Sequence, residues 1–474
     1  MTEIFSLLRE SPQALYGMRF HQGFKLSVAQ LQEIHLTWAR RRFDTLRTSI
    51  RALDKLAAEQ GISRIDTLDD LVPLLFKHTV YKSYPISFLE RGRFDALTRW
   101  LDGLTTLDLS GVDTAGVQTI DDWIDCLDTH TELRIAHSSG TSGKLSVIPR
   151  TREHWFNQVR LTAGCVRDWH GPDSGPDLFS TPMPFIRLSE RYGASVQHRS
   201  ANALVEMIAG SEDNTLFLFP TERYSADMAS LGGRLRAAAA RGEQGRLELS
   251  PVLMARREEF ARRNAQRPKA MERFFADARE RFGGRDVLIQ AIWVNLLEPA
   301  EEARKQGLKG LFGPRSALLT GGGLKGQTAA PDWRERITEF LGTDNYYEFY
   351  GMTEMLSNAP ACRQGNYHVS PVTVPFLIDG ESGEVLPRKG TQSGRFAFFD
   401  LLPESYWGGF VTGDLVTMGG WDDVCPCGRV GPYVHADIRR FSDIEGGDDK
   451  IDCAGAPEAH DRAMEYLVNS SGGH

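Results

Sequence analysis

The sequence predicts an α/β protein in which a layered core of strands and helices is preceded by a helical region and followed by a β-rich region. Between residues 151 and 345, short apolar stretches alternate with charged stretches of helical spacing, which is typical of layered α/β structure. Beyond residue 345, short apolar stretches separated by turn residues predict a meander of strands. With 474 residues, 41% of them hydrophobic, the chain is long enough for more than one subdomain.

The first 130 residues are expected to be mostly helical and to cap the core. Apolar residues recur at helical spacing over 31–56 and 88–104, and a shorter helix is expected at 120–127. The aromatic residues of this region are of the kind that usually belong to a core, and no pattern there points to chemistry.

Individual elements of the core can be placed from their pattern. Buried strands are predicted at residues 216–219, 287–293 and 317–320, and helices at 234–240, 257–281 and 333–341. In the β-rich region, strands are predicted at 376–379, 396–400 and 410–412.

A stretch of small residues from Ser138 to Lys144 separates two strand-like flanks at 133–137 and 147–150. Such a loop can wrap a phosphate, because its glycines turn backbone N–H groups toward one anion and Lys144 adds a positive charge. It is not a Walker P-loop, which would need Gly at Ser138 and Ser or Thr at Leu145. The alternative interpretation is a flexible Ser/Gly linker.

Charge and hydropathy exclude some classes of function. The net charge of -8 gives no electrostatic footprint for nucleic acid, and the basic stretches alternate with acids as solvated helix faces do. The first residues do not resemble a signal peptide, and the longest apolar-rich stretch, 287–297, is too short to cross a bilayer. We therefore expect a cytoplasmic protein with neither nucleic acid nor membrane as partner.

The six cysteines are too few for a secreted disulfide scaffold, but their spacing suggests a metal site. Cys425 and Cys427 form a tight Cys-Pro-Cys-Gly knuckle, and Cys362 stands six residues before His368. These four residues make a Cys3His set suited to tetrahedral, structural zinc with no open position for catalysis. The alternative is that they are incidental free thiols.

Three further segments follow the small-residue loop in order. They are Gly321-Gly322-Gly323, the segment Tyr347-Glu-Phe-Tyr-Gly-Met-Thr-Glu354, and Thr412-Gly413-Asp414. Together with the loop, over roughly residues 131–455, they resemble the adenylate-forming superfamily of acyl-CoA ligases, aryl-acid ligases and peptide-synthetase adenylation domains. That resemblance implies the superfamily's α/β core and a requirement for ATP and Mg2+.

The resemblance also implies roles for particular residues. Thr353 would contact the α-phosphate, Glu354 would bind Mg2+, and Lys144 would contact phosphate, so these three are the expected catalytic residues. Asp414 would bind the ribose hydroxyls and Tyr350 would lie against adenine. The full set of expected nucleotide-binding residues is Ser138, Ser139, Gly140, Thr141, Ser142, Gly143, Gly321, Gly322, Gly323, Tyr350, Gly351, Asp414 and Arg440.

The sequence departs from the superfamily pattern at two places. The hinge segment of the superfamily is matched only in part by Arg439-Arg440 and by Asp448-Asp449-Lys450, and Arg440 is the residue expected there to contact the nucleotide. Only 19 residues follow Gly455, which leads us to expect almost no C-terminal lid domain. The predicted organisation is a helical region over 1–130, an adenylate-forming core over 131–445 and a short remnant over 446–474. The Cys/His placement and the Gly-Lys-x-Ser loop resemble the phenylacetate-CoA-ligase-like branch.

These observations lead to a functional prediction with two alternatives. The chain is expected to activate a carboxylic acid, an aryl acid of secondary metabolism such as antibiotic biosynthesis, as an acyl-adenylate. The acyl group would pass to a small-molecule amine or hydroxyl, to a protein or to CoA. The alternatives are an acyl-protein synthetase that delivers a fatty acyl group to a partner, and an inactive nucleotide-binding scaffold. A homodimer is left open.

Overall fold

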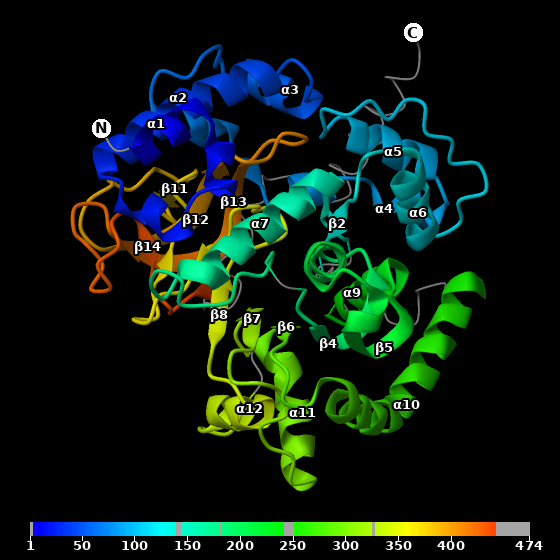
Figure 1. Ribbon diagram of the computed structural model, residues 1–474. Helices are drawn as coiled ribbons and strands as arrows, with labels where there is room; N and C mark the ends of the chain where they lie inside the picture. Colours follow the sequence, from blue (N-terminus) through cyan, green and yellow to red (C-terminus); the bar gives the residue numbers. More distant parts are fainter. Residues whose placement is uncertain (1–2, 139–143, 181, 241–250, 325–327, 442–474) are drawn as a thin grey trace.

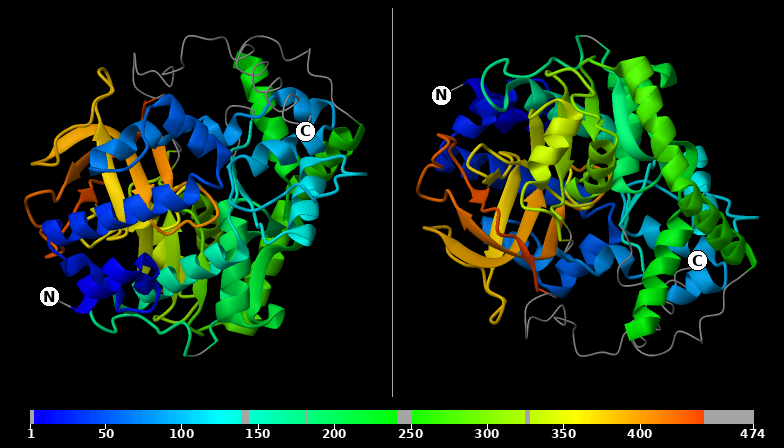
Figure 2. Two further views of the ribbon diagram at one scale, coloured as in Figure 1. Left: turned by 90° about the horizontal axis from the view of Figure 1, so that it is seen from above. Right: turned by 90° about the horizontal axis from the view of Figure 1, so that it is seen from below.

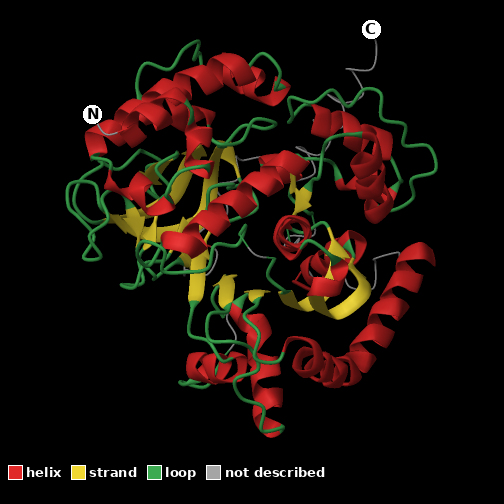
Figure 3. Cartoon of the chain, in the orientation of Figure 1, coloured by secondary structure: helices red, strands yellow, loops and turns green. Residues whose placement is uncertain are grey.

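The computed structural model describes residues 3–138, 144–180, 182–240, 251–324 and 328–441 (Figure 1). Over these residues the architecture is mixed α/β, with two larger sheets and helices around them (Figure 3). The predicted class of fold is therefore confirmed. None of the described helices is long and apolar enough to cross a membrane.

The chain begins with helices that pack onto the rest of the molecule. Their bounds are α1 Glu3–Glu10, α2 Val28–Leu46, α3 Arg51–Glu59, α4 Ile86–Glu90, α5 Phe94–Asp102 and α6 Ile120–His130. Short 3-10 turns connect them at η1 Pro12–Tyr16, η2 Phe20–Lys25, η3 Leu68–Leu74 and η4 Val80–Lys82.

Two of the predicted helices are interrupted. The pattern at 31–56 divides into α2 and α3 because Ile50 takes extended backbone and is fully buried, which ends the first helix. The pattern at 88–104 divides into α4 and α5, where Gly92 adopts a left-handed φ of 63° that terminates a helix. Helical spacing alone could not locate these breaks, because the apolar residues stay in phase across them.

A six-stranded sheet has the order β5-β4-β6-β7-β8-β9. Its strands are β4 Phe185–Gly193, β5 Thr215–Tyr224, β6 Leu288–Gln290, β7 Ala317–Gly321, β8 Tyr346–Tyr350 and β9 Ala359–Pro360. All neighbouring pairs are parallel except β8 and β9. Parallel strands place their carboxyl ends at one edge, where ligands of open α/β sheets usually bind.

Helices cover both faces of this sheet. They are α7 Arg152–Asp168, α8 Val196–Leu204, α9 Ala226–Ala240, α10 Pro251–Phe282, α11 Trp293–Lys305 and α12 Trp333–Leu341, with short helical segments at Val205–Ala209 and Glu212–Asn214. One face packs on α10, α11 and α12 through Ile186, Leu188, Leu216, Leu218, Ile289 and Leu318. The alternate residues belong to the main core that includes α7 and α8: Phe185, Phe217, Leu288, Ala317, Leu319 and Tyr347.

Two predictions in this layer need correction. The apolar run 287–293 is strand only over β6, since Ile292 is the extended residue before α11 and the fully buried Trp293 starts that helix. Strand β4 was not predicted, because Arg187, Glu190 and Arg191 give it the composition of a surface segment. Those charged residues are buried or half-buried in the structure.

The β-rich region forms a second sheet with the order β10-β14-β13-β12-β11, joined by β1 and β15 at β13. Its strands are β1 Phe76–Lys77, β10 Tyr367–His368, β11 Thr373–Ile378, β12 Gln392–Asp400, β13 Gly409–Gly419, β14 Tyr433–Val434 and β15 Arg439–Arg440. The long pairings are antiparallel, as expected for a meander, but β1 pairs parallel to β13. The first part of the chain therefore supplies a strand to this sheet.

The N-terminal helices lie against this second sheet (Figure 2). From α2, His35 contacts the carbonyl of Pro371 at 2.9 Å and Arg42 donates to the carbonyl of Leu401 at 3.1 Å. One cluster of buried apolar residues runs continuously from Phe5 to Val434. The helical region and the core thus share their interior.

At the end of β12, one buried carboxylate, that of Asp400, accepts hydrogen bonds from the backbone of three other residues. Asp400 is 1% exposed, and its carboxylate accepts from the backbone N–H groups of Leu356 and Ser357 at 2.9 Å and of Leu402 at 3.0 Å. These three residues lie outside the strands, so no β-ladder supplies acceptors for their N–H groups. The carboxylate therefore satisfies donors that would otherwise be buried without partners.

We predict that Asp400→Ala lowers the free energy of unfolding by about 3 kcal/mol, because three buried amides lose their acceptor. Denaturant titration measures the change. Asp379→Ala is the matched control, since Asp379 also accepts backbone N–H groups but in an exposed turn. Equal effects of the two substitutions would contradict the argument.

Candidate active site

Three predicted residues from separate strands meet at one point. Tyr350 ends β8 and donates its hydroxyl to Asp414 Oδ2 at 2.8 Å. Arg440, on the neighbouring β15, pairs with Asp414 Oδ1 at 3.0 Å, and the two residues are opposite each other in the β13–β15 ladder. Burial, with the charge of Asp414, raises the pKa of the Tyr350 phenol, so the hydroxyl stays protonated as a donor.

Asp414 is 4% exposed, yet it keeps capacity for a ligand. A carboxylate has about four lone-pair positions, and the described contacts use one on each oxygen. The site therefore offers a fixed, oriented acceptor beside an aromatic ring. A diol such as ribose fits that arrangement.

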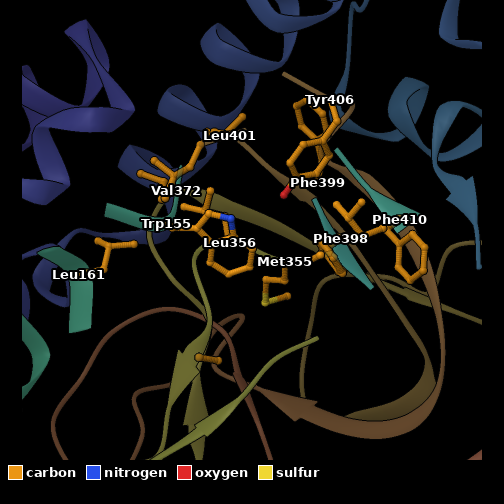
Figure 4. Close-up of a cluster of buried hydrophobic side chains, with 14 of the residues drawn as sticks. Trp155, Leu161, Met355, Leu356, Val372, Phe398, Phe399, Leu401, Tyr406 and Phe410 are labelled. Atoms are coloured by element: carbon orange, nitrogen blue, oxygen red, sulfur yellow. The ribbon is translucent and has the colours of Figure 1, made fainter. Parts of the chain in front are cut away.

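The segment after β8 is fixed by a buried arginine. Arg150 is 0% exposed and donates its Nη2 to the carbonyls of Thr353, at 2.8 Å, and Met355, at 2.5 Å. The guanidinium lies 4.5 Å from the centre of the Trp155 ring, which belongs to the apolar cluster under the site (Figure 4). Arg150 thus holds the backbone on both sides of Glu354.

Burial is the main influence on the Glu354 carboxyl. Burial raises the pKa of this carboxyl, while Arg150, Lys82 and Arg440 act in the opposite direction. Tyr406 donates to the Glu354 carbonyl at 3.3 Å and further fixes the backbone.

Glycines bring bare backbone to the same edge of the sheet. Gly321 ends β7, and a Cβ on it would lie 2.4 Å from the carbonyl oxygen of Phe349 on β8. Gly322 and Gly323 follow with left-handed φ values of 73° and 55°. A Cβ on Gly351 would lie 2.1 Å from Asn358 Oδ1. Glycine is therefore required at these positions by close approach or by backbone conformation.

The predicted phosphate loop sits on a hairpin. Strands β2 Ala136–His137 and β3 Val147–Ile148 pair antiparallel, and Ser138 Oγ accepts from the Ser146 N–H at 3.0 Å. Tyr84 OH exchanges hydrogen bonds of 3.0 Å with both the N–H and the carbonyl of Leu145. Lys144 Nζ lies 5.9 Å from the centre of the Tyr84 ring. Both ends of the loop are thereby held; Ser139, Gly140, Thr141, Ser142 and Gly143 lie outside the described residues.

The four predicted metal ligands come together. The ligand atoms of Cys362, His368, Cys425 and Cys427 all lie within 4.8 Å of one another, and His368 Nε2 is 3.3 Å from Cys427 Sγ. Tetrahedral zinc with Zn–S bonds of about 2.3 Å puts its ligand atoms about 3.8 Å apart, so only small movements are needed. The described cysteines form no disulfide.

The chemistry of this cluster fits a metal. Burial lowers the pKa of His368 to about 3, so its imidazole is neutral, as a ligand must be. Burial opposes ionisation of Cys427, but N–H donors of Arg429 outweigh it and lower the pKa of that thiol. Asn366 Nδ2 donates to Cys425 Sγ at 3.4 Å. Donors aimed at sulfur are the surroundings that thiolate ligands require.

The structure therefore brings the predicted residues together as two adjoining groups. Tyr350, Thr353, Glu354, Asp414 and Arg440 surround the end of β8, with the glycines beside them. The ring of Tyr350 lies 5.9 Å from that of Tyr367, the residue before His368, which joins the Cys/His group to the first. Of the expected hinge segments, 448–450 lies outside the described residues.

Two residues that hold the site were missed in the sequence. Arg150 lies two residues after the buried strand β3, where a charged residue needs a specific partner, and this is the signal that could have drawn attention to it. Tyr84 lies about sixty residues before the loop and carries no local signal. Its role depends on a tertiary contact.

The comparisons with known proteins identify the fold. No family model and no curated protein sequence matches the chain. Among solved structures, an open conformation of 2-hydroxyisobutyryl-CoA ligase in complex with 2-HIB-AMP and CoA matches with a TM-score of 0.51 and 15% identity, over 89% of this chain and 72% of that one. The chain therefore has the fold of adenylate-forming enzymes.

Other matches to solved structures are weaker. The same ligase in its thioesterification state gives a TM-score of 0.49 at 15% identity, over 87% of this chain and 68% of that one. ATP-bound MatB from Rhodopseudomonas palustris gives 0.35 at 14% identity, over 64% and 46%.

We predict that Arg150→Lys reduces ATP-dependent turnover by about 100-fold, because one ammonium cannot hold the carbonyls on both sides of Glu354 in the same geometry. Steady-state kinetics with saturating ATP measures the change. Arg152→Lys, at an exposed ion pair with Glu206, is the control and should leave turnover within about twofold. Parallel behaviour of the two variants would refute a positioning role for Arg150.

Proposed function

We propose that this chain is an ATP- and Mg2+-dependent enzyme that activates a carboxylic acid as its acyl-adenylate. The observation that carries the proposal is the meeting of Tyr350, Asp414 and Arg440 beside the segment that Arg150 fixes. The fold supports it, since a solved representative of that fold contains an acyl-AMP and CoA.

In the proposed reaction, a carboxylate oxygen of the acid attacks the α-phosphorus of ATP while the bond to pyrophosphate breaks. The protein mainly positions and neutralises charge. Tyr350 would lie against adenine, Asp414 would accept from the ribose hydroxyls, and Thr353 would contact the α-phosphate. Lys144 and the small-residue loop would cover the outer phosphates. Magnesium, held by Glu354, would neutralise charge on the phosphates.

We propose an aryl acid as the substrate, on the resemblance of the loop and of the Cys/His placement to the phenylacetate-CoA-ligase-like branch. The acceptor of the acyl group would be a small-molecule amine or hydroxyl, a protein, or CoA. Each of these nucleophiles can attack the mixed anhydride of an acyl-adenylate and release AMP. The cytoplasm supplies ATP for the reaction.

The experiment that tests this function is acid-dependent exchange of pyrophosphate into ATP over a panel of aryl and fatty acids. We predict exchange with aryl acids, and a loss of about 10- to 100-fold in Glu354→Gln, since an amide binds Mg2+ poorly. Glu381→Gln, in an exposed turn, is the control. Exchange with fatty acids alone would favour an acyl-protein synthetase. Silence over the whole panel would favour a nucleotide-binding scaffold.

We also propose that the Cys/His group holds one structural zinc ion. Four protein ligands would close the coordination shell, so the metal would stabilise the fold and take no part in adenylation. The ligands come from residues 362–368 and 425–427, which lie far apart in the chain, and the group packs against Trp169 and Phe24. Zinc would thus link residues 362–368 to residues 425–427. Trp169 at the end of α7 and Phe24 in the N-terminal turns would pack against the linked segments.

We predict about one zinc per chain in freshly purified protein, by elemental analysis, and its loss together with a lowered melting temperature in Cys425→Ser. Cys126→Ser is the matched control, because Cys126 is half-buried and far from the group in sequence. Protein that contains no zinc, or zinc content unchanged by Cys425→Ser, would disprove the assignment.

A further inference from the structure

A buried arginine, Arg187, lies near the amino end of β4 and in register with the carboxyl end of β6, outside the groups described above. Arg187 is 3% exposed and follows residues of β4 that pair with β6, which places it beside Gln290. By the alternation of the strand it belongs to the face that packs on α7 and α8. Its hydrogen bond to the carbonyl of Gln197 on α8 agrees with that position.

All the hydrogen-bond partners of Arg187 are neutral. Nε donates to Ser189 Oγ at 2.7 Å, and Nη1 donates to the Gln197 carbonyl at 2.8 Å and to Gln290 Oε1 at 2.6 Å. Nη2 has only a contact of 3.5 Å with Gln197 Oε1, at the limit of hydrogen bonding. One edge of the guanidinium is therefore left with weak acceptors.

No carboxylate oxygen of the described residues forms an ion pair with Arg187. Burial lowers the pKa of this arginine to about 10, so it remains cationic at neutral pH. Glu190 acts on it through longer-range electrostatics and lies 3.9 Å from His198 instead. A buried charge without a direct counter-ion is expensive, which makes it a candidate for a ligand's charge.

Neighbouring buried arginines show that this region can supply counter-ions. Arg191, on the same strand and 7% exposed, pairs with Glu212 at 2.6 Å. Arg199, on α8 and 7% exposed, pairs with Asp128 at 2.6 Å. Arg187 differs from both in having only neutral partners, although all three are buried to a similar degree.

The sheet register relates Arg187 to Gly321, one of the glycines expected to border the nucleotide. Gln290 is opposite Leu319 of β7, and Gly321 follows two residues later on the same face. Two strand spacings correspond to about 10 Å and two residues along a strand to about 7 Å, so Arg187 and the bare backbone of Gly321 are roughly one small substrate molecule apart. The partners Ser189, Gln197 and Gln290 are each partly exposed, while Arg187 itself is buried.

We propose that Arg187 recognises a second carboxylate of the acid that is activated, so that the substrate class is aromatic dicarboxylic acids. This inference rests on the proposed adenylation and specifies its substrate. One carboxylate would react near the glycines, and the other would take up the Nη2 edge of Arg187 as a charge-assisted hydrogen bond. Gln290 and Gln197 would hold the guanidinium in orientation.

The test compares matched pairs of aryl acids in pyrophosphate exchange: isophthalate with benzoate, and terephthalate with benzoate. We expect kcat/KM to favour the dicarboxylic member at least tenfold. Arg187→Gln should abolish this preference by lowering exchange with the dicarboxylic acids while leaving the monocarboxylic acids within a few fold. Arg191→Gln is the matched control on the same strand, and it should leave the preference intact because its charge is already paired with Glu212.

A second variant covers the case in which Arg187→Gln does not fold. Gln290→Glu is close in shape and places a carboxylate on Nη1, so it should neutralise Arg187 and also abolish the preference. Equal use of both members of each pair by the wild type, or a preference that survives both substitutions, would overturn the inference and leave the adenylation standing.

If no acid supports pyrophosphate exchange, a thermal-shift measurement distinguishes the proposed adenylation from the proposed carboxylate recognition by Arg187. Stabilisation by isophthalate that Arg187→Gln or Gln290→Glu removes would support Arg187 as a carboxylate site, while the silence itself would count against adenylation. Absence of both exchange and stabilisation would overturn both proposals.

Discussion

The contact on which the site depends most is that of Arg150 with the backbone around Glu354. A fully buried guanidinium needs compensation from its surroundings; here Nη2 donates to two carbonyls and the face of Trp155 lies against the group, while Nε and Nη1 are buried without a hydrogen-bond partner among the described residues. Arg150 lies two residues after the hairpin that carries the small-residue loop, so the same residue connects that loop to the end of β8. Two segments about two hundred residues apart are thereby held in one geometry.

Four buried arginines of the described residues, Arg150, Arg187, Arg191 and Arg199, differ in the groups that meet their charge. Arg191 and Arg199 have carboxylate partners and stabilise the fold around β4 and α8. Arg150 has carbonyls and an aromatic ring, and it fixes a segment of the candidate site. Arg187 has neutral side chains and one carbonyl. The distinction follows from the same physical requirement, since each buried charge needs compensation from the protein or from a ligand.

The helical beginning of the chain is part of this arrangement. Val430, next to the Cys/His group, donates its N–H to the Phe24 carbonyl at 2.9 Å, and Arg429 stacks at 3.6 Å on Trp169 at the end of α7. Tyr84 holds the base of the small-residue loop. A continuous core joins these residues to both sheets. The site therefore rests on contacts between parts of the chain that sequence order separates.

The sequence by itself determined the class of fold, the places of α9, α10, α12 and of β5 to β7 in the layered core, and the candidate residues of the site, because apolar periodicity and short motifs are local properties. It could also group Cys362 with Cys425 as metal ligands from residue chemistry alone. Tertiary structure decided the breaks within the N-terminal helices and the existence of β4. The charged residues of β4 are typical of an exposed segment, and only their partners in the structure show that they are buried or half-buried. Tertiary structure also decided that Arg440 meets Asp414 and that Arg150 and Arg187 are buried. Burial and counter-ions are relations between distant segments, and local pattern does not contain them.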